Sequence, residues 1–286
     1  MSAARKRRDA GQLQTVARAV LTPFFRFCWR IRTEGLDRIP DTGGALIAPN
    51  HTSVLDSFFV PLVLPRRITY VGKAEYLDDW KTKYLFPAMG MIPIDRGGGD
   101  ASKRALDASA TVLERGELFG IYPEGTRSRS GQLHKGHTGV ARLALRTGSP
   151  IVPVGIVGAD AIQPADAKVP RFFRELTIRF GEPIDVTRYL DRANDRLVLR
   201  QITDEVMYEI RNLSGQDYVD TYATKRHESI PTGRTTVGLR PESDRRVTTE
   251  PATPEPVEAV DEFEPSAARS SSEVIQQRPL VDLLRI

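Results

Sequence analysis

The chain has 286 residues, of which 40% are hydrophobic and 27% are charged, a balance typical of a globular protein with a sizeable core. Its net charge of +4 is concentrated at one end, because residues 1–32 alone contribute +7, which argues against nucleic acid as a partner. The single cysteine, Cys28, excludes an internal disulfide framework and a cysteine-built zinc site, and is compatible with a reducing compartment.

Residues 13–31 have the periodicity of an amphipathic helix lying in a membrane interface. One face collects the apolar residues Leu13, Val16, Ala17, Val20, Leu21, Phe24, Phe27, Cys28 and Ile31. The opposite face carries Arg18, Arg26, Arg30 and Arg32, which suit anionic headgroups. Pro23 predicts a kink or a break. The alternative is a helix that packs on its own domain and keeps a solvated basic face.

The longest uncharged run in this segment, residues 19–25, is far shorter than the roughly 20 residues needed to cross a bilayer. The segment also lacks a small-residue cleavage site after an unbroken apolar core, so we do not expect a signal peptide. We therefore expect a peripheral protein at the cytoplasmic face of the cell membrane, with membrane phospholipids among its partners.

Strand-like and helix-like segments alternate beyond residue 43. Apolar runs predict strands at residues 44–48, 68–71, 91–94, 118–122, 151–157 and 176–180. Amphipathic patterns predict helices at residues 54–64, 101–114, 136–146 and 195–213. This alternation predicts an α/β fold with a mixed, largely parallel sheet flanked by helices.

The composition changes at about residue 228 to Pro, Thr, Ser, Glu and Arg with few large apolar residues. Such a segment cannot bury enough surface to order itself, so we expect a disordered tail. The predicted organisation is a basic membrane-associating segment at 1–32, one catalytic domain at 33–227 and the tail at 228–286.

His51 and Asp56 form the first candidate site, within the run Asn-His-Thr-Ser-Val-Leu-Asp. Five residues apart on one helix, they would point about 140° away from each other. They can meet if His51 lies in the loop after the strand and Asp56 in the first turn of the next helix. Asp56 would then fix the imidazole tautomer and leave the other nitrogen as a base. Alternatively, Ser53 and Asp56 are a helix-capping pair and His51 is a loop residue.

Polar side chains also follow three other predicted apolar strands. Residues 122–128 read Tyr-Pro-Glu-Gly-Thr-Arg-Ser, in which Glu124 could orient either Arg127 or a substrate hydroxyl, and Arg127 offers a planar fork for phosphate. Arg96 follows the strand at 91–94, and Lys73 follows the strand at 68–71. Taken singly, each of these residues is better explained as a member of a surface ion pair.

These runs, followed by Ile-Val-Pro-Val-Gly at 151–155, resemble in order the four signature blocks of the glycerolipid acyltransferases. The similarity is to 1-acylglycerol-3-phosphate O-acyltransferases in particular, and it covers roughly residues 37–180. The N-terminal helix also resembles the membrane-docking element of bacterial members.

The resemblance implies a role for each matching residue. His51 would be the general base and Asp56 its orienting partner. Arg96 and Arg127 would bind the acceptor's phosphate, with Lys73 nearby. Glu124, Gly125 and Thr126 would shape this substrate-binding site. The acyl donor would be an acyl thioester, acyl-CoA or acyl carrier protein, with no cofactor and no metal. A backbone N–H near Gly125 is one candidate for stabilising the oxyanion.

Other functions fit parts of the same pattern. A thioesterase or other hydrolase could use His51 and Asp56 to activate water, and a non-catalytic lipid-binding protein could keep the pocket and the helix. The acceptor could also be another lysophospholipid or a lipid-linked molecule. Residues 131–138 nearly spell a phosphate-binding P-loop, but His137 stands in place of the lysine and no strand precedes the run.

Overall fold

A computed structural model describes residues 3–73, 82–94, 101–164, 167 and 169–224. The helices are α1 (Ala3–Cys28), α2 (Asp56–Val63), α3 (Thr82–Ala88), α4 (Ala101–Glu114), α5 (Gly139–Thr147), α6 (Ala159–Ile162) and α7 (Arg196–Ser214). The strands are β1 (Arg30–Glu34), β2 (Ala45–Pro49), β3 (Ile68–Lys73), β4 (Met91–Ile94), β5 (Leu118–Gly120), β6 (Leu133–His134), β7 (Ile151–Val157), β8 (Glu175–Phe180) and β9 (Tyr218–Val219). Short 3-10 turns occupy Leu36–Arg38 and Thr187–Arg192. The tail predicted to be disordered, residues 228–286, lies outside the described residues.

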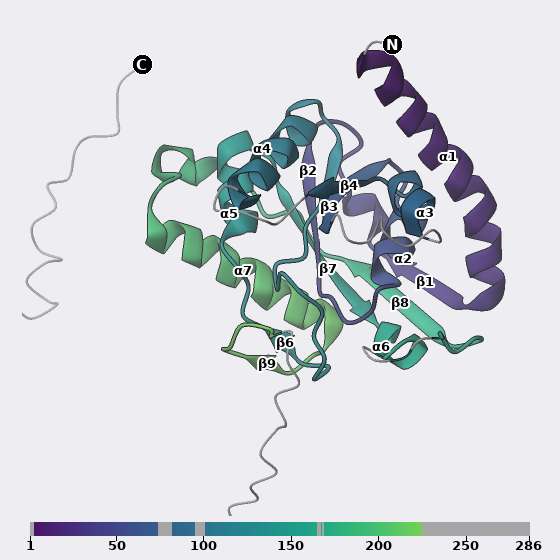
Figure 1. Cartoon of the computed structure of the whole chain (residues 1–286). Helices are drawn as coiled ribbons and strands as arrows, with labels where there is room; N and C mark the ends of the chain where they lie inside the picture. Colours follow the sequence, from purple (N-terminus) through teal and green to yellow (C-terminus); the bar gives the residue numbers. More distant parts are fainter. Residues whose placement is uncertain (1–2, 74–81, 95–100, 165–166, 168, 225–286) are drawn as a thin grey trace, which may run out of the picture. The chain divides into compact units, whose positions relative to one another are not determined.

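Seven strands form one sheet in the order β1-β8-β7-β2-β5-β3-β4 (Figure 1). All neighbouring pairs in this sheet are parallel except β7 and β8, which run antiparallel. The expected mixed, largely parallel sheet is therefore present. The strand β1 was not predicted, because its sequence Arg-Ile-Arg-Thr-Glu is mostly exposed and charged, as is common at a sheet edge.

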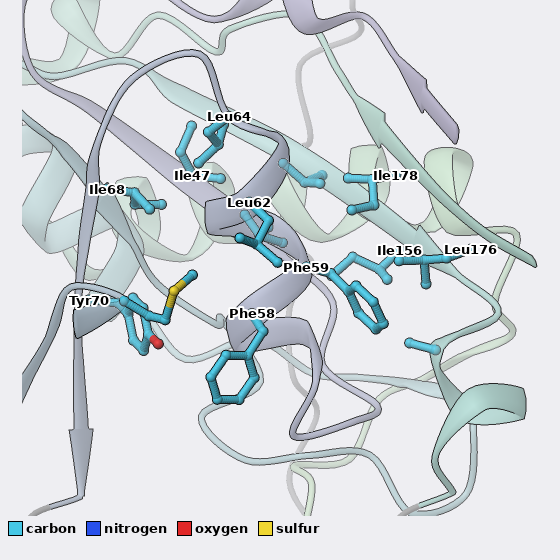
Figure 2. Packing of buried hydrophobic residues seen from close by; sticks show 14 of the residues in the cluster. Ile47, Phe58, Phe59, Leu62, Leu64, Ile68, Tyr70, Ile156, Leu176 and Ile178 are labelled. Carbon is cyan, nitrogen blue, oxygen red and sulfur yellow. The ribbon is translucent and has the colours of Figure 1, made fainter. Parts of the chain in front are cut away.

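Helices cover both faces of the sheet and bury its alternating side chains. Ala45 and Ile47 of β2 point into a core shared with α1, α2, α3 and α6, whereas Leu46 and Ala48 point into a second core shared with α4, α5 and α7. Figure 2 shows the first core, where the aromatic and aliphatic side chains of α2 lie among residues from the central strands. Burial on both faces explains why β2 reads as a continuous apolar run.

The N-terminal helix differs from the sequence expectation in three ways. It continues through Pro23 without a break. It ends at Cys28, so Arg30, Ile31 and Arg32 belong to β1 rather than to a helix face. Arg18 is not turned to solvent, because its guanidinium donates to the carbonyl of Leu64 and to that of Arg66 at 3.4 Å.

The predicted apolar face of α1 is divided between the domain and the surface. Leu21, Phe25 and Cys28 pack into the first core. The remaining large apolar side chains of the described part, Val16, Val20, Phe24 and Phe27, are exposed. One helix therefore both joins the core and leaves an apolar stripe outside. None of the described helices has an apolar stretch that would span a bilayer.

Candidate active site

The candidate site lies beyond the carboxyl ends of four adjacent parallel strands. His51 follows β2, Glu124 follows β5, and Lys73 ends β3 in register with Ile94, the last residue of β4. Because parallel strands end at the same edge of a sheet, segments distant in sequence converge there. Arg96, predicted for the same edge, lies outside the described residues, and the side chain of Lys73 is not described either.

The structure brings His51 and Asp56 into direct contact. His51 lies in the connection between β2 and α2, and Asp56 is the first residue of α2. His51 Nδ1 is 3.0 Å from Asp56 Oδ2, and the Asp56 side chain is fully buried. If Nδ1 carries the proton and donates it to the carboxylate, Nε2 is the ring nitrogen that can accept another proton.

Asp56 also holds the loop that precedes its own helix, whereas no side-chain hydrogen bond from the described residues caps the N-terminus of α2 itself. The same oxygen, Oδ2, accepts the backbone N–H groups of Thr52 at 2.9 Å and Ser53 at 2.8 Å. Within the described part of the chain, the other buried oxygen, Oδ1, has no hydrogen-bond partner. A carboxylate at a helix N-terminus is favoured by the helix dipole, which offsets part of that cost.

Glu124 ties the two loops of the site together. One carboxyl oxygen accepts the N–H of His51 and the other accepts the N–H of His134, both at 3.0 Å. Burial raises the pKa of Glu124 to about 7, against the lowering effect of these two hydrogen bonds. That Glu124 orients Arg127 or a substrate hydroxyl stays a prediction; the structure shows that its carboxylate holds the backbone of His51 in place.

The histidine faces a cavity of about 620 Å³. The polar part of its lining includes His51, Gly125, Thr126 and Arg127, so four of the predicted site residues share one cavity. The apolar part comes from Val54, Tyr70, Phe86, Met91 and Val140 of neighbouring elements. A cavity lined by both polar and apolar residues suits an amphiphilic ligand.

Tyr122 is a site residue to which sequence reasoning gave no role, although it opens the run that contains Glu124. Its ring stacks on the imidazole of His51, with centroids 3.9 Å apart and planes 17° apart. Burial, together with the negative charge of Asp56, raises the pKa of Tyr122 well above its ordinary value. The phenol therefore stays protonated and fixes the plane of the imidazole by packing.

Gly125 is needed for both its conformation and its size. Its φ is +72°, and a Cβ atom at this position would lie 3.0 Å from Cδ2 of His137. Its own N–H donates to the carbonyl of Tyr122 at 3.0 Å, so this particular amide is engaged in a turn. That hydrogen bond argues against Gly125 N–H as the oxyanion donor.

A segment near the end of the described chain, residues 216–222, contacts residues next to the site, and we call it the C-terminal strap. Gln216 accepts from the amide of the buried Asn50 at 2.7 Å and donates to the carbonyl of Gly131 at 2.7 Å. At the other end of the strap, Tyr222 stacks on His137 with centroids 4.5 Å apart. Burial and the nearby Arg200 lower the pKa of His137, which favours the neutral ring. The strap thus braces both sides of the cavity.

Metal ligation has no obvious place here. Across the parts of the chain that the structure describes, no group of three or more His, Cys, Asp or Glu side chains is arranged to hold a metal ion.

Comparisons with known proteins show what this chain is similar to in sequence and fold. Residues 30–157 match the family model described as Acyltransferase. The chloroplastic 1-acyl-sn-glycerol-3-phosphate acyltransferase LPAT1 of Arabidopsis thaliana is 27% identical over 141 residues, which cover 49% of this chain and 39% of the relative. The corresponding alpha enzyme of Mus musculus is 30% identical over 126 residues, 44% of each chain. The C-terminal strap lies beyond the part that matches the family model.

One other relative and one solved structure cover more of the chain. An uncharacterized protein of Mycobacterium leprae is 29% identical over 238 residues, covering 68% of this chain and 62% of the relative. The chain therefore spans less than two thirds of the length of these curated relatives. The crystal structure of the 1-acyl-sn-glycerophosphate acyltransferase PlsC from Thermotoga maritima has the same fold, with a TM-score of 0.56 at 21% identity over 74% of this chain and 83% of that one.

The raised pKa of Glu124 predicts a specific pH dependence of stability. A carboxyl group whose pKa rises from 4.5 to about 7 on folding favours the folded state at low pH, and this contribution is lost between those values. The stability difference, defined as the free energy of unfolding of the wild type minus that of Glu124→Gln, should therefore decrease with rising pH. Between pH 4.5 and 7 the decrease should be on the order of 3 kcal/mol. Urea unfolding at several pH values measures this difference. The exposed Glu182, substituted in the same way, should give a nearly constant difference; a constant difference for Glu124 too would contradict the raised pKa.

Removing the Gln216 side chain should loosen the site without unfolding the domain. Gln216→Ala loses the hydrogen bonds to Asn50 and Gly131, so backbone amides around residues 50–53 and 131–137 should exchange with deuterium several-fold faster. Mass spectrometry of these peptides measures the change. Gln201→Ala, which removes an exposed glutamine on α7 bonded to Tyr189, is the matched control. Equal protection in both variants would exclude the strap as a brace.

Proposed function

We propose that this protein transfers a fatty acyl group to the free hydroxyl of 1-acylglycerol 3-phosphate, because residues 30–157 match the Acyltransferase family model and the chain is similar to 1-acyl-sn-glycerol-3-phosphate acyltransferases of two other organisms. The product would be phosphatidic acid, a step of phospholipid biosynthesis. The acyl donor would be a thioester, either acyl-CoA or acyl carrier protein, used as a co-substrate with no further cofactor. The observation that carries the proposal is the pairing of His51 with buried Asp56 at the wall of a cavity that also exposes Arg127.

The proposed chemistry is a single transfer with one base. Nε2 of His51 takes the proton of the acceptor hydroxyl as its oxygen forms a bond to the thioester carbonyl carbon. Asp56 stabilises the resulting imidazolium, because its carboxylate accepts from Nδ1. When the tetrahedral intermediate collapses, the carbon–sulfur bond breaks and the imidazolium returns the proton to the departing thiolate. No acyl-enzyme is required, in keeping with the burial of Cys28 in the core.

The polar and apolar residues of the cavity lining suit the phosphate and the acyl chain of the acceptor. Arg127 is one of the lining residues and can form charge-assisted hydrogen bonds with a phosphate. Phe86, Met91 and Val140 give the lining the apolar character that an acyl chain needs. Arg96 and Lys73 complete the phosphate site in this proposal on the strength of the family resemblance alone, and Gly125 and Thr126 shape its wall.

We also propose that the protein works as a peripheral protein at the cytoplasmic face of the cell membrane. Its substrates are membrane lipids, and α1 exposes Val16, Val20, Phe24 and Phe27 on one side. Side chains of this kind can enter the acyl boundary while neighbouring arginines meet anionic headgroups.

The deciding experiment is phosphatidic acid formation from lysophosphatidic acid and a long-chain acyl-CoA, with wild type beside His51→Ala. Losing a general base should lower kcat by about 10²–10⁴-fold while the thermal midpoint stays close to that of the wild type. His134→Ala is a matched control, because the side chain of His134 contacts Ser130 rather than the cavity wall. Equal activity of wild type and His51→Ala would refute the base, and release of free fatty acid without transfer would identify a hydrolase.

Arg127→Ala should raise the KM for the acceptor at least about tenfold and change the KM for the donor little, because a phosphate contact is lost. Initial rates with each substrate varied in turn measure the two constants. Arg142→Ala, on the exposed side of α5, should leave both unchanged. A similar rise in both constants for Arg127→Ala would show that Arg127 supports the structure of the site instead.

A further inference from the structure

A second apolar element stands beside the exposed stripe of α1. The loop before β8 exposes Phe172 and Phe173, by 48% and 67% of their surface, and Phe27 of α1 is exposed by 76%. The rings of Phe27 and Phe173 meet edge to face, with centroids 6.3 Å apart. We call Val20, Phe24 and Phe27 of α1, together with Phe172 and Phe173, the aromatic ridge.

The loop is firmly joined to the end of α1, so the ridge is one surface. Phe173 N–H donates to the carbonyl of Cys28 at 2.7 Å, and Arg30 N–H donates to the carbonyl of Arg174 at 3.0 Å. The indole N–H of Trp29 donates to the carbonyl of Arg171 at 2.8 Å, while its ring stacks on Phe172. These contacts bring residues more than 140 positions apart in sequence to the same edge of the sheet (Figure 1).

Phe173 has an unfavourable backbone conformation for its residue type. Its φ is +59°, the one positive φ among the non-glycine residues that the structure describes. Asparagine or glycine tolerates this region far better than a bulky aromatic residue. The ring of Phe173 is two-thirds exposed, so its contacts with Phe27 and Phe172 do not account for a phenylalanine at this strained position.

The charges around the ridge select the kind of partner. The segments 26–32 and 171–175 contain five arginines and one carboxylate, Glu175. Glu175 lies 3.6 Å from both Arg30 and Arg32, whose side chains are still 73% and 69% exposed. An apolar ridge bordered by excess positive charge complements an anionic phospholipid surface.

We propose that the loop at residues 171–174 is a second membrane-inserting element, which enters an anionic bilayer together with α1. This inference rests on the proposed peripheral membrane function and adds a specific contact to it. A domain that docks on a membrane through one helix alone can rotate about the axis of that helix. Contact through two apolar elements fixes the orientation of the domain. The ridge would therefore hold the catalytic domain at one defined angle to the bilayer that contains its substrate.

The substitution Phe173→Asn separates membrane binding from folding. Asparagine accepts the positive φ, so the thermal midpoint should stay the same or rise, while the exposed ring is lost. Binding to vesicles of phosphatidylcholine with 30% phosphatidylglycerol should weaken about tenfold, as expected for one aromatic side chain withdrawn from lipid. Leu197→Asn is the matched control, because Leu197 is 79% exposed on α7 and lies outside the ridge. Its vesicle binding should equal that of the wild type.

A fluorescent label gives an independent reading of insertion. Cys28 is buried, so Phe173→Cys offers one accessible thiol among the described residues for an environment-sensitive dye. Its emission should shift to the blue on adding the anionic vesicles, whereas a dye at Leu197→Cys should not respond.

The outcomes separate this inference from the proposed reaction. If the wild type binds the vesicles and Phe173→Asn binds them equally well, insertion of the loop is refuted, while docking through α1 remains supported. A wild type that does not bind vesicles would overturn membrane docking as a whole, while acyl transfer to lysophosphatidic acid in detergent micelles would test the reaction separately. A wild-type dimer in ultracentrifugation that Phe173→Asn dissociates would identify a second copy as the occupant of the ridge and overturn the proposal.

Discussion

The carboxylate of Glu124 is the contact on which the geometry of the site depends. Its two oxygens accept backbone N–H groups from His51 and His134, which belong to loops more than 80 residues apart. Because the backbone of His51 is held there, its imidazole can reach Asp56 on one side and stack on Tyr122 on the other. A buried carboxylate that accepts two main-chain hydrogen bonds acts through position rather than through direct chemistry. This position needs two acceptor oxygens, which a glutamate provides. A glutamine would turn its NH2 group, a donor, toward one of the two N–H groups.

The sequence predicted the parts of the fold that depend on burial. The strands β2 and β7 are buried on both faces and read as apolar runs, and α4 and α7 show strong helical periodicity. β1 escaped prediction because an exposed, charged edge strand has no apolar pattern. The division of α1 could not be foreseen either, since a helical wheel indicates which residues are apolar but not which of them a neighbouring helix will cover. The position of Arg18 was wrongly predicted for a similar reason, because its partners are backbone carbonyls of a turn distant in sequence.

Prediction of the site succeeded where a short sequence spacing determines a contact. His51 and Asp56 lie five residues apart across the end of a strand and the start of a helix, so the local chain geometry brings them together. The role of Glu124 was missed because its partners are main-chain atoms, which carry no signal in the sequence. Gln216 and Tyr222 were missed because they lie more than 80 residues from the groups they brace.

The pairing of β1 with β8 sets an order of events during synthesis. The ribosome releases α1 and β1 some 140 residues before the strand that holds the loop with Phe172 and Phe173. The aromatic ridge therefore does not exist while the chain is incomplete, and the early helix offers only its own stripe to any membrane nearby. Residues 171–174 can reach their place only once β8 has been synthesised and pairs with β1. If the ridge binds membranes as proposed, only molecules whose domain has folded would have the full membrane affinity. Incomplete or misfolded chains would bind the lipid surface more weakly.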